Sequence, residues 1–201
     1  GLGSGITATS CGGAVCTLTL DDAELAYLQN GFTGITIGST AGTGAIAINY
    51  TTPYTFLDPL TIRSNTSGGG AIAATSALNT GTNALTVTSG GAVSVAGITS
   101  GALAITGTGI TLNNNITTTG SQTYTGAVTL GDAITLTSNN NTVSFSGSGS
   151  TVNGAKDFTV NAGSGAINFG GVVGGSSVLS SLALTTTHAT GITLRDRKSV
   201  V

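Results

Sequence analysis

The feature that most constrains this chain is a 24-residue interval between short segments in which apolar and hydroxyl side chains alternate. Two series of apolar residues, offset by two positions, keep this interval. They are Ile110, Ile134, Phe158 and Leu182, and Leu112, Leu136, Val160 and Leu184. Side chains two positions apart in a strand point the same way, so each segment offers two apolar side chains to one side. A period in the twenties with several short strands in each period is typical of a solenoid.

The solenoid that fits such segments is a parallel β-helix, in which each period forms one coil and the inward residues of successive coils stack. The segments are about three residues long, for example ITI at 35–37, LTV at 85–87 and INF at 167–169. Strands of an ordinary sandwich are longer, commonly about five or six residues. We therefore predict an all-β chain, a right-handed parallel β-helix with coils of about 24 residues. Its structural core ladder consists of the two series above.

The spacing of the segments divides the chain into three parts. Before residue 85 the intervals vary, so we expect irregular β-helix coils over 1–84, with a short helix near 21–30, and regular coils over 85–194. Loops of variable length are tolerated on one side of a solenoid. Residues 195–201, RDRKSVV, depart abruptly from the composition before them, and we expect this tail to be non-native or truncated. Because the chain also lacks an initiator Met, we expect it to be a fragment of a longer protein.

The segment DDAELAYLQNG, which begins at Asp21, has helical character. Asp21 fits the N-cap and Glu24 the third helical position, which together form the capping-box pattern. Leu25 and Leu28 fall on one face, and Gly31 fits the C-terminal stop. The end of a solenoid has apolar side chains that must be covered, so we expect this helix to cap the N-terminal coils.

Charge is scarce along the chain. Charged residues are 6% of the 201 residues and the net charge is −2, whereas about 25% is the usual charged fraction. No basic patch is present to neutralise phosphates, which argues against a nucleic-acid partner. Apolar runs are only a few residues long, so we expect no membrane insertion. The mean hydropathy is +0.36, higher than that of disordered chains, which are poor in hydrophobic residues.

Two long stretches carry recurring phrases. The first reads TLTLDDAELAYLQNGFTGITIGST and, a little later, GAIAINYTTPYTFLDPLTIRSNTSGGGAI. The second reads SQTYTGAVTLGDAITLTSNNNTVSFSGSGSTVNGAKDFTVNAGSGAINFGGVVGG. Both resemble the large bacterial exoproteins of the filamentous-haemagglutinin type, the second through their repeats of the QTY.GAVTL kind. The resemblance covers residues 17 to about 194, most of the chain.

The resemblance implies a right-handed β-helical stalk, secreted by a Gram-negative bacterium to the extracellular space or the cell surface. It implies a role in attachment to a host or environmental surface, whose ligand it does not specify. It also implies an outer-membrane transporter as a partner of the parent protein during secretion. The N-terminal secretion domain that the family usually shows is not evident here, so we assign no residue to that transporter.

We assign no catalytic, cofactor-binding or metal-binding residue. The only histidine, His188, has an acid nearby only at Asp196 in the tail, whereas a catalytic triad needs a carboxylate that orients the imidazole. A polysaccharide-active enzyme on the same fold is the alternative function. Such a site needs clustered basic and acidic groups, and residues 64–155 contain one charged residue, Asp132. We therefore predict that the chain is not an enzyme.

Two polar features have a structural and a functional interpretation. Outward threonines of the TLT, ITI and LTV motifs could form the hydroxyl ladders of an ice-binding solenoid, but the Thr-x-Thr motif is not repeated at one fixed phase. We therefore rank ice binding below the stalk role as a candidate function. The asparagine runs at 113–115 and 139–141 are separated by close to the interval of the apolar series. We expect them in corresponding turns, where Asn tolerates left-handed geometry and can stack side-chain amides between coils.

The two cysteines, Cys11 and Cys16, enclose a Gly-rich tetrapeptide in CGGAVC. In an exported protein they could close a short disulfide loop, or they could remain two free thiols. The sequence leaves both open. Their spacing differs from CxxC, and no His or further Cys lies near, which argues against a zinc or redox site.

Overall fold

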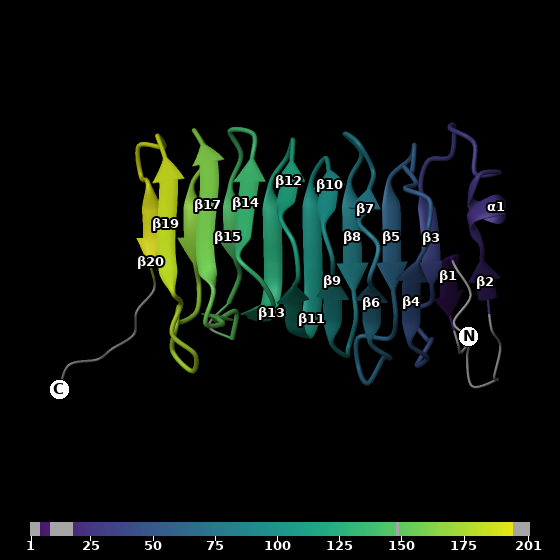
Figure 1. Cartoon of the computed structure of the whole chain (residues 1–201), viewed down its shortest axis with the longest axis horizontal. Helices are drawn as coiled ribbons and strands as arrows, with labels where there is room; N and C mark the ends of the chain where they lie inside the picture. Colours follow the sequence, from purple (N-terminus) through teal and green to yellow (C-terminus); the bar gives the residue numbers. More distant parts are fainter. Residues whose placement is uncertain (1–4, 9–17, 148, 195–201) are drawn as a thin grey trace.

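The computed structural model describes residues 5–8, 18–147 and 149–194, which form a β-solenoid of about seven turns with one short helix. Successive coils follow one another along a single axis, from the purple N-terminal end to the yellow C-terminal end in Figure 1. Within the described chain, the strands from β3 to β20 pair with one another in parallel throughout. The predicted all-β parallel solenoid is therefore confirmed.

Each coil runs through three stacks of strands, and long strands β11 (Leu103–Leu112) and β13 (Gln122–Leu130) belong to both the first and the second stack. The other strands of the first stack are β3 (Ile35–Gly38), β5 (Leu60–Arg63), β8 (Leu85–Thr88), β15 (Val143–Phe145), β18 (Ile167–Phe169) and β20 (Ile192–Leu194). Those of the second stack are β4 (Ile46–Asn49), β6 (Ile72–Ala74), β9 (Val93–Val95) and β16 (Val152–Asn153). The third stack consists of β7 (Leu78–Asn79), β10 (Ile98–Ser100), β12 (Ile116–Thr118), β14 (Ile134–Ser138), β17 (Asp157–Gly163) and β19 (Ser181–Thr186).

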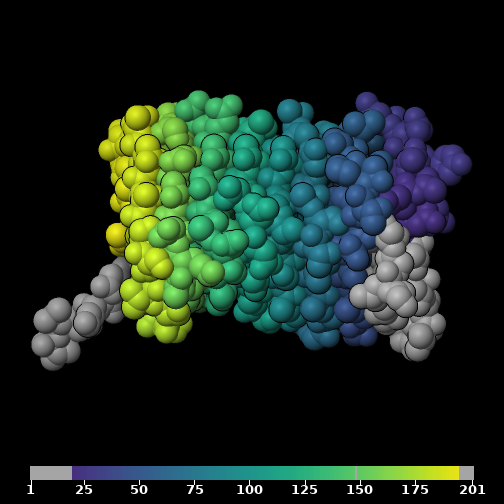
Figure 2. All heavy atoms as spheres, viewed as in Figure 1, coloured from purple at the N-terminus to yellow at the C-terminus, as the bar shows by residue number. Residues whose placement is uncertain are grey.

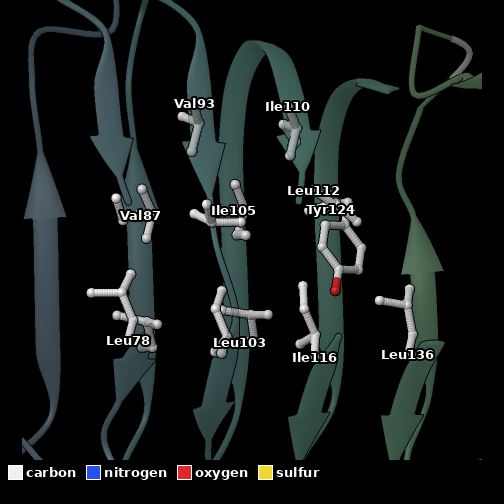
Figure 3. Close-up of a cluster of buried hydrophobic side chains, with 14 of the residues drawn as sticks. Leu78, Val87, Val93, Leu103, Ile105, Ile110, Leu112, Ile116, Tyr124 and Leu136 are labelled. Atoms are coloured by element: carbon white, nitrogen blue, oxygen red, sulfur yellow. The ribbon is translucent and has the colours of Figure 1, made fainter. Parts of the chain in front are cut away.

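The strands form because apolar and small polar residues alternate along them. In β8, Leu85 and Val87 are fully buried, while Thr86 and Thr88 are partly exposed. The alternation stacks the apolar side chains of successive coils inside the solenoid, as Figure 3 shows for the middle coils. Each fully buried aliphatic side chain contributes about 1.5–3 kcal/mol. The inward ladders are therefore the main source of stability.

The N-terminal end differs from the rest because its strands are antiparallel. Strand β1 (Gly5–Ala8) pairs with both β2 (Leu18–Leu20) and β4. Helix α1 (Asp22–Leu25) follows β2 and carries the predicted capping box, in which Asp21 Oδ1 accepts from the N–H of Glu24 at 2.8 Å. The reciprocal bond joins the N–H of Asp21 to Glu24 Oε2 at 3.0 Å. These elements close the N-terminal end of the solenoid, as expected.

The helix is shorter than the predicted segment and has a single turn. After it, the N–H groups of Tyr27 and Leu28 bond to carbonyls three residues back, so the chain tightens and leaves the helix. A single turn gains little from helix formation itself. Leu25 is 1% exposed and Leu28 packs against the core, so burial of these two side chains holds the turn in place.

Six of the eight predicted ladder residues lie in register in the third stack. They are Ile134, Phe158 and Leu182 in one row, and Leu136, Val160 and Leu184 in the next. The members from β14 and β17 are buried, whereas Leu182 is 42% exposed. The difference arises because β19 is the last strand of the third stack.

The prediction was wrong for the register of Ile110 and Leu112. Both are buried, but they belong to the second stack, where Ile110 pairs with Val93 and Val128. The coil that starts at Ile110 already returns to the same position at Val128, well before the predicted period is complete. The residue one full predicted period after Ile110 is therefore Ile134, which lies in the third stack and not in the second.

Coil length varies in the opposite sense to the expectation. In the first stack, Ile35, Leu60 and Leu85 occupy equivalent positions at an even spacing, close to the predicted period. The next equivalent positions, Leu103 and Gln122, follow at clearly shorter intervals. The interval between β18 and β20 is again as long as those before residue 85. The coils before residue 85 are thus regular, and the short coils lie in the middle.

The two asparagine runs lie at different corners, so the expectation of corresponding turns was wrong. Residues 113–115 join β11 to β12, and residues 139–141 join β14 to β15. The expected local geometry is present at Asn140, whose φ of 60° is left-handed. Its Oδ1 accepts from the N–H of Ser164 in the next coil at 3.0 Å. The amide therefore links two coils at a corner.

Replacing Asn140 with Ala is expected to lower the free energy of unfolding by about 2–3 kcal/mol. A left-handed Ala costs about 1–2 kcal/mol, and the lost amide acceptor costs about 1 kcal/mol more. Asn140→Gly is the matched control, because Gly adopts this conformation without steric cost and loses only the side-chain hydrogen bonds to Ser164 and Asn139. Urea denaturation followed by circular dichroism measures both variants, and equal losses would contradict the strain argument.

Candidate functional site

The acids at the N-terminal end hold turns in place. Asp22 Oδ2 accepts from Thr51 Oγ1 at 2.6 Å and from the N–H of Thr52 at 3.1 Å. Asp58 is 5% exposed and its Oδ1 accepts from the N–H of Gly31 at 3.2 Å. These carboxylates tie the α1 region to the corners of the first coils, which is a structural use of their charge.

The acids further along the chain serve separate corners. Asp132 Oδ1 accepts from the N–H of the next residue, Ala133, at 2.8 Å. Asp157 Oδ1 accepts from Ser181 Oγ at 2.7 Å, which links the starts of β17 and β19. Across the described ranges, no group of three or more His, Cys, Asp or Glu side chains is placed to hold a metal ion.

His188 is an exposed residue at the corner that follows β19. Its Nδ1 accepts from the N–H of Thr190 at 3.2 Å and lies 2.8 Å from Thr190 Oγ1. The backbone N–H of His188 donates to Thr186 Oγ1 at 2.9 Å. The imidazole therefore shapes its own turn. Asp196, the only acid near it in the sequence, lies outside the described residues, as do Cys11 and Cys16 with their two open interpretations.

A row of inward hydroxyl groups ends the strands of the third stack. Ser100 pairs with Thr118, and Thr118 pairs with Ser138, in successive coils. The row continues to Thr80, and all four residues are at most 2% exposed. Thr80 Oγ1 donates to the carbonyl of Asn83 at 2.7 Å, and Thr118 Oγ1 donates to the carbonyl of Gly120 at 2.6 Å. The hydroxyls of Thr80, Thr118 and Ser138 thus satisfy buried carbonyls of the corner, which an apolar side chain would leave without a partner, whereas Ser100 Oγ is buried without a hydrogen-bond partner.

The core also holds a polar network that sequence reasoning missed. Gln122 occupies an inward position of the first stack between Leu103 and Val143, and it is fully buried. Its Nε2 donates to Thr118 Oγ1 at 3.1 Å and to the carbonyl of Thr137 at 2.9 Å. Its Oε1 accepts from Tyr124 Oη at 2.8 Å. The spacing of two between Gln122 and Tyr124 was the available signal, because it puts both side chains on the same side of the strand.

The buried tyrosines predict a loss of stability in alkali. Burial raises the pKa of Tyr50 from 10.0 to about 12, and burial also raises the pKa of Tyr124. Their raised pKa values mean that folding favours the neutral phenol, so the stabilisation is complete below pH 10 and is lost as pH rises through about 12. Urea midpoints measured from pH 9 to pH 12 should fall in the wild type and fall less in Tyr50→Phe. An equal fall in both proteins would contradict the assignment to Tyr50.

Outward hydroxyl and amide side chains line up in rows across the coils. The row of the first stack is Thr36, Thr61, Thr86, Thr123, Ser144, Asn168 and Thr193, and Ala104 interrupts it between Thr86 and Thr123. The row of the third stack is Asn79, Thr99, Thr117, Thr137, Asn161 and Thr185. The complete Thr-x-Thr motif faces outward at two places in the first stack, Thr86 with Thr88 and Thr123 with Thr125, so it is not repeated in every coil. The rows stay aligned although the coils differ in length, because the additional residues of the longer coils lie in the corners between strands.

The described acidic side chains and His188 are thus spread over many coils. The feature that repeats from coil to coil on the surface is the rows of outward hydroxyl groups. Successive members of a row are about 4.8 Å apart, the spacing of neighbouring strands. Such rows offer hydrogen-bond donors and acceptors along the axis of the solenoid.

No protein-family model, curated protein or solved structure matches this chain. The class that the fold defines is the β-solenoid. In the part of the chain that the structure describes, no helix is both long and apolar enough to cross a membrane.

Proposed function

We propose that this chain is a structural stalk, the passenger region of a secreted bacterial adhesin or surface exoprotein that takes part in attachment. The observation that carries the proposal is the continuous parallel pairing of the first stack, which runs without interruption from β3 to β20. Figure 2 shows the coils as successive colour bands along the rod. A segment whose coils stack on one another in this way holds its two ends at a fixed separation.

The distribution of charge supports the same function. The described acids each accept hydrogen bonds from their own turn or a neighbouring coil, as described above for Asp22, Asp58, Asp132 and Asp157. A site for polysaccharide cleavage needs several such groups to converge on the substrate. The resemblance to exoproteins of the filamentous-haemagglutinin type adds the location, the extracellular face of a Gram-negative bacterium, and the role in attachment.

Surface display tests the stalk directly. A nanobody fused after the chain and anchored to the bacterial surface through it should capture antigen-coated beads better than the same nanobody anchored without the chain. The physical reason is that a rigid rod holds the nanobody away from the surface polysaccharide of the cell. Equal bead capture by cells that anchor the nanobody with and without the chain would overturn the proposal. Release of sugar products from a panel of polysaccharides by the purified chain would also overturn it.

Lengthening the rod provides a matched control. Because Leu60 and Leu85 occupy the same position in successive coils, inserting two extra copies of residues 60–84 preserves the register. The lengthened chain should fold, with a maximum dimension about 10 Å greater by small-angle X-ray scattering, since each coil adds about 4.8 Å. It should capture beads at least as well as the original. An insertion of half a copy breaks the register and should unfold the coils around it.

The aligned outward threonines favour a second candidate, the binding of ordered water at an ice surface. Their row on the first stack offers hydroxyl groups at a regular spacing on either side of Ala104, and Thr88, Thr106 and Thr125 form a second row beside it. The purified chain should then inhibit ice recrystallisation. Thr86→Lys with Thr123→Lys should abolish the effect, whereas Thr117→Lys on the third stack should retain it. Recrystallisation at the rate of a protein-free control would exclude this candidate.

A further inference from the structure

The sequence contains two Asn-Gly pairs, Asn30 with Gly31 and Asn153 with Gly154. In such a pair the backbone nitrogen of the glycine can attack the side-chain amide of the asparagine, since glycine has no side chain to obstruct the approach. The product is a five-membered succinimide ring, which water opens to aspartate or isoaspartate. The asparagine amide must turn toward its own backbone for this reaction, so the two pairs differ by what holds each amide.

The amide of Asn153 is held at both of its polar atoms. Its Oδ1 accepts from the N–H of Ser176 at 3.0 Å and from the N–H of Ser177 at 3.4 Å, both in the next coil. Its Nδ2 donates to Thr151 Oγ1 at 3.2 Å. Asn153 also belongs to β16, which pairs with β13. A reaction at this pair must first break these hydrogen bonds, so the fold protects Asn153.

The side chain of Asn30 is exposed, and no hydrogen bond to another described residue holds its amide. Asn30 and Gly31 lie in the irregular segment between α1 and β3. Gly31 has a φ of 128°, and apart from its chain neighbours no atom lies within 4 Å of the place where a Cβ would stand. The backbone at this pair is therefore uncrowded, and the amide can turn toward the nitrogen of Gly31.

A buried carboxylate lies at the reacting nitrogen. Asp58 is 5% exposed, and its Oδ1 accepts from the N–H of Gly31 at 3.2 Å. Its other oxygen, Oδ2, is buried and accepts no hydrogen bond from the described residues. A buried charge that few groups solvate interacts strongly with the donor that reaches it. A carboxylate in hydrogen-bond contact with a proton can accept that proton as a general base.

We propose that this pair is a self-modification site, at which Asn30 is deamidated with Asp58 as the general base. Asp58 Oδ1 takes the proton from the N–H of Gly31, and the Gly31 nitrogen bonds to Cγ of Asn30. The Cγ–Nδ2 bond breaks, and Nδ2 leaves as ammonia with the proton that Asp58 took up. Water then opens the ring: hydrolysis at Cγ gives aspartate, and hydrolysis at the backbone carbonyl gives isoaspartate. No oxidant or reductant takes part, and the inference does not rest on the stalk function.

The modification changes a contact that ties the N-terminal segment to the first coils. While the ring exists, the Gly31 nitrogen carries no hydrogen, so Asp58 loses the bond that Gly31 donates. Isoaspartate lengthens the backbone by one carbon, and both products add a negative charge one residue away from this contact. Because like charges repel, deamidation should loosen the segment between α1 and β3 from the corner that precedes β5.

Mass spectrometry of the full chain during storage at neutral pH tests the site. Trypsin separates the two pairs, because Arg63 and Lys156 are the only Lys or Arg residues before the tail and yield peptides 1–63 and 64–156. In the folded chain, Asn30 should convert about tenfold or more faster than Asn153, whose hydrogen bonds hold it back. In guanidinium chloride, where neither amide is held, the two rates should become similar. Equal rates in the folded chain would overturn the proposal.

Two variants locate the reaction and its base. Asn30→Gln should abolish the conversion in peptide 1–63, and conversion that persists would place the reaction at another asparagine. Asp58→Asn keeps an oxygen that accepts from Gly31 but cannot take up the proton, so it should slow the conversion of Asn30 about tenfold or more. The rate at Asn153 should not change.

Asp132→Asn is the matched control for the carboxylate, because Asp132 bonds to its own turn at Ala133 and should leave both rates unchanged. An unchanged rate at Asn30 in Asp58→Asn would overturn the role of Asp58. If Asp58→Asn unfolds the N-terminal coils by far-ultraviolet circular dichroism, the folded wild type still decides. Its Asn30 should then convert faster than the same residue in guanidinium chloride, and a slower conversion in the folded chain would overturn the role of Asp58.

Discussion

Replacing Phe145 with Ala is expected to lower the free energy of unfolding by about 3–5 kcal/mol, the usual cost of a large aromatic cavity. Phe145 is 1% exposed and lies at the centre of an aromatic ladder. Its ring stacks on Tyr124 at 5.0 Å between centroids and on Phe169 at 4.9 Å, and it meets Phe158 edge to face at 6.0 Å. Each such pair contributes about 0.5–1.5 kcal/mol beyond its buried area. The substitution therefore removes contacts with three other strands at once.

The measurement is urea denaturation monitored by circular dichroism, with two matched variants. Phe145→Leu keeps most of the volume and loses the stacking, so its loss should be smaller than that of Phe145→Ala. Phe32→Ala removes an aromatic ring that is 52% exposed and should change the stability little. If Phe145→Ala were no worse than Phe32→Ala, the aromatic ladder would not be part of the stable core.

The strands and the kind of core could be predicted because both depend on local alternation. Segments such as LTV at 85–87 and VSF at 143–145 specify which side chains point inward, whatever the neighbouring coil contains. The capping box at Asp21 and Glu24 is equally local, since its two hydrogen bonds join residues three apart. In each case the residues that determine the structure are adjacent in the sequence.

The register could not be predicted because it depends on the corners. The coil from Leu85 to Leu103 is markedly shorter than the coil from Ile35 to Leu60. One fixed interval in the sequence therefore relates equivalent positions in some coils and different stacks in others. Ile110 and Ile134 are separated by the predicted period but lie in different stacks. Ile134 and Phe158 are separated by the same period and lie in the same stack.

The polar positions of the interior were missed for a different reason. A search for apolar residues at inward positions passes over Gln122, which is buried only because Thr118, Thr137 and Tyr124 supply its hydrogen bonds. Those partners come from different strands, so their proximity follows from the fold. The same holds for the outward hydroxyl rows, which become aligned only when the coils stack.

Replacing Ile134 with Asp is expected to unfold the coils around it at neutral pH. Ile134 is 2% exposed and pairs with Phe158 in the next coil. A carboxylate at this position would be buried without a partner, and such a charge is far less stable there than in water. Burial raises the pKa of the new carboxyl above its ordinary value of about 4. The variant should therefore be most stable at low pH and lose stability as pH rises through about 4 toward 7. Thr117→Asp is the matched control, because Thr117 is exposed and faces outward.

Hydrogen exchange separates local from global unfolding in this variant. Each coil of a solenoid contacts only its neighbours, so a defect in one coil weakens those beside it and spares distant ones. Amide protection should be lost in β12, β14 and β17, the strands on both sides of the substitution. Protection in β3 and β5 should persist, because their stability comes from the N-terminal coils. Loss of protection in all strands together would show that the chain folds as one cooperative unit. An unchanged melting curve would show that Ile134 does not occupy the inward ladder at all.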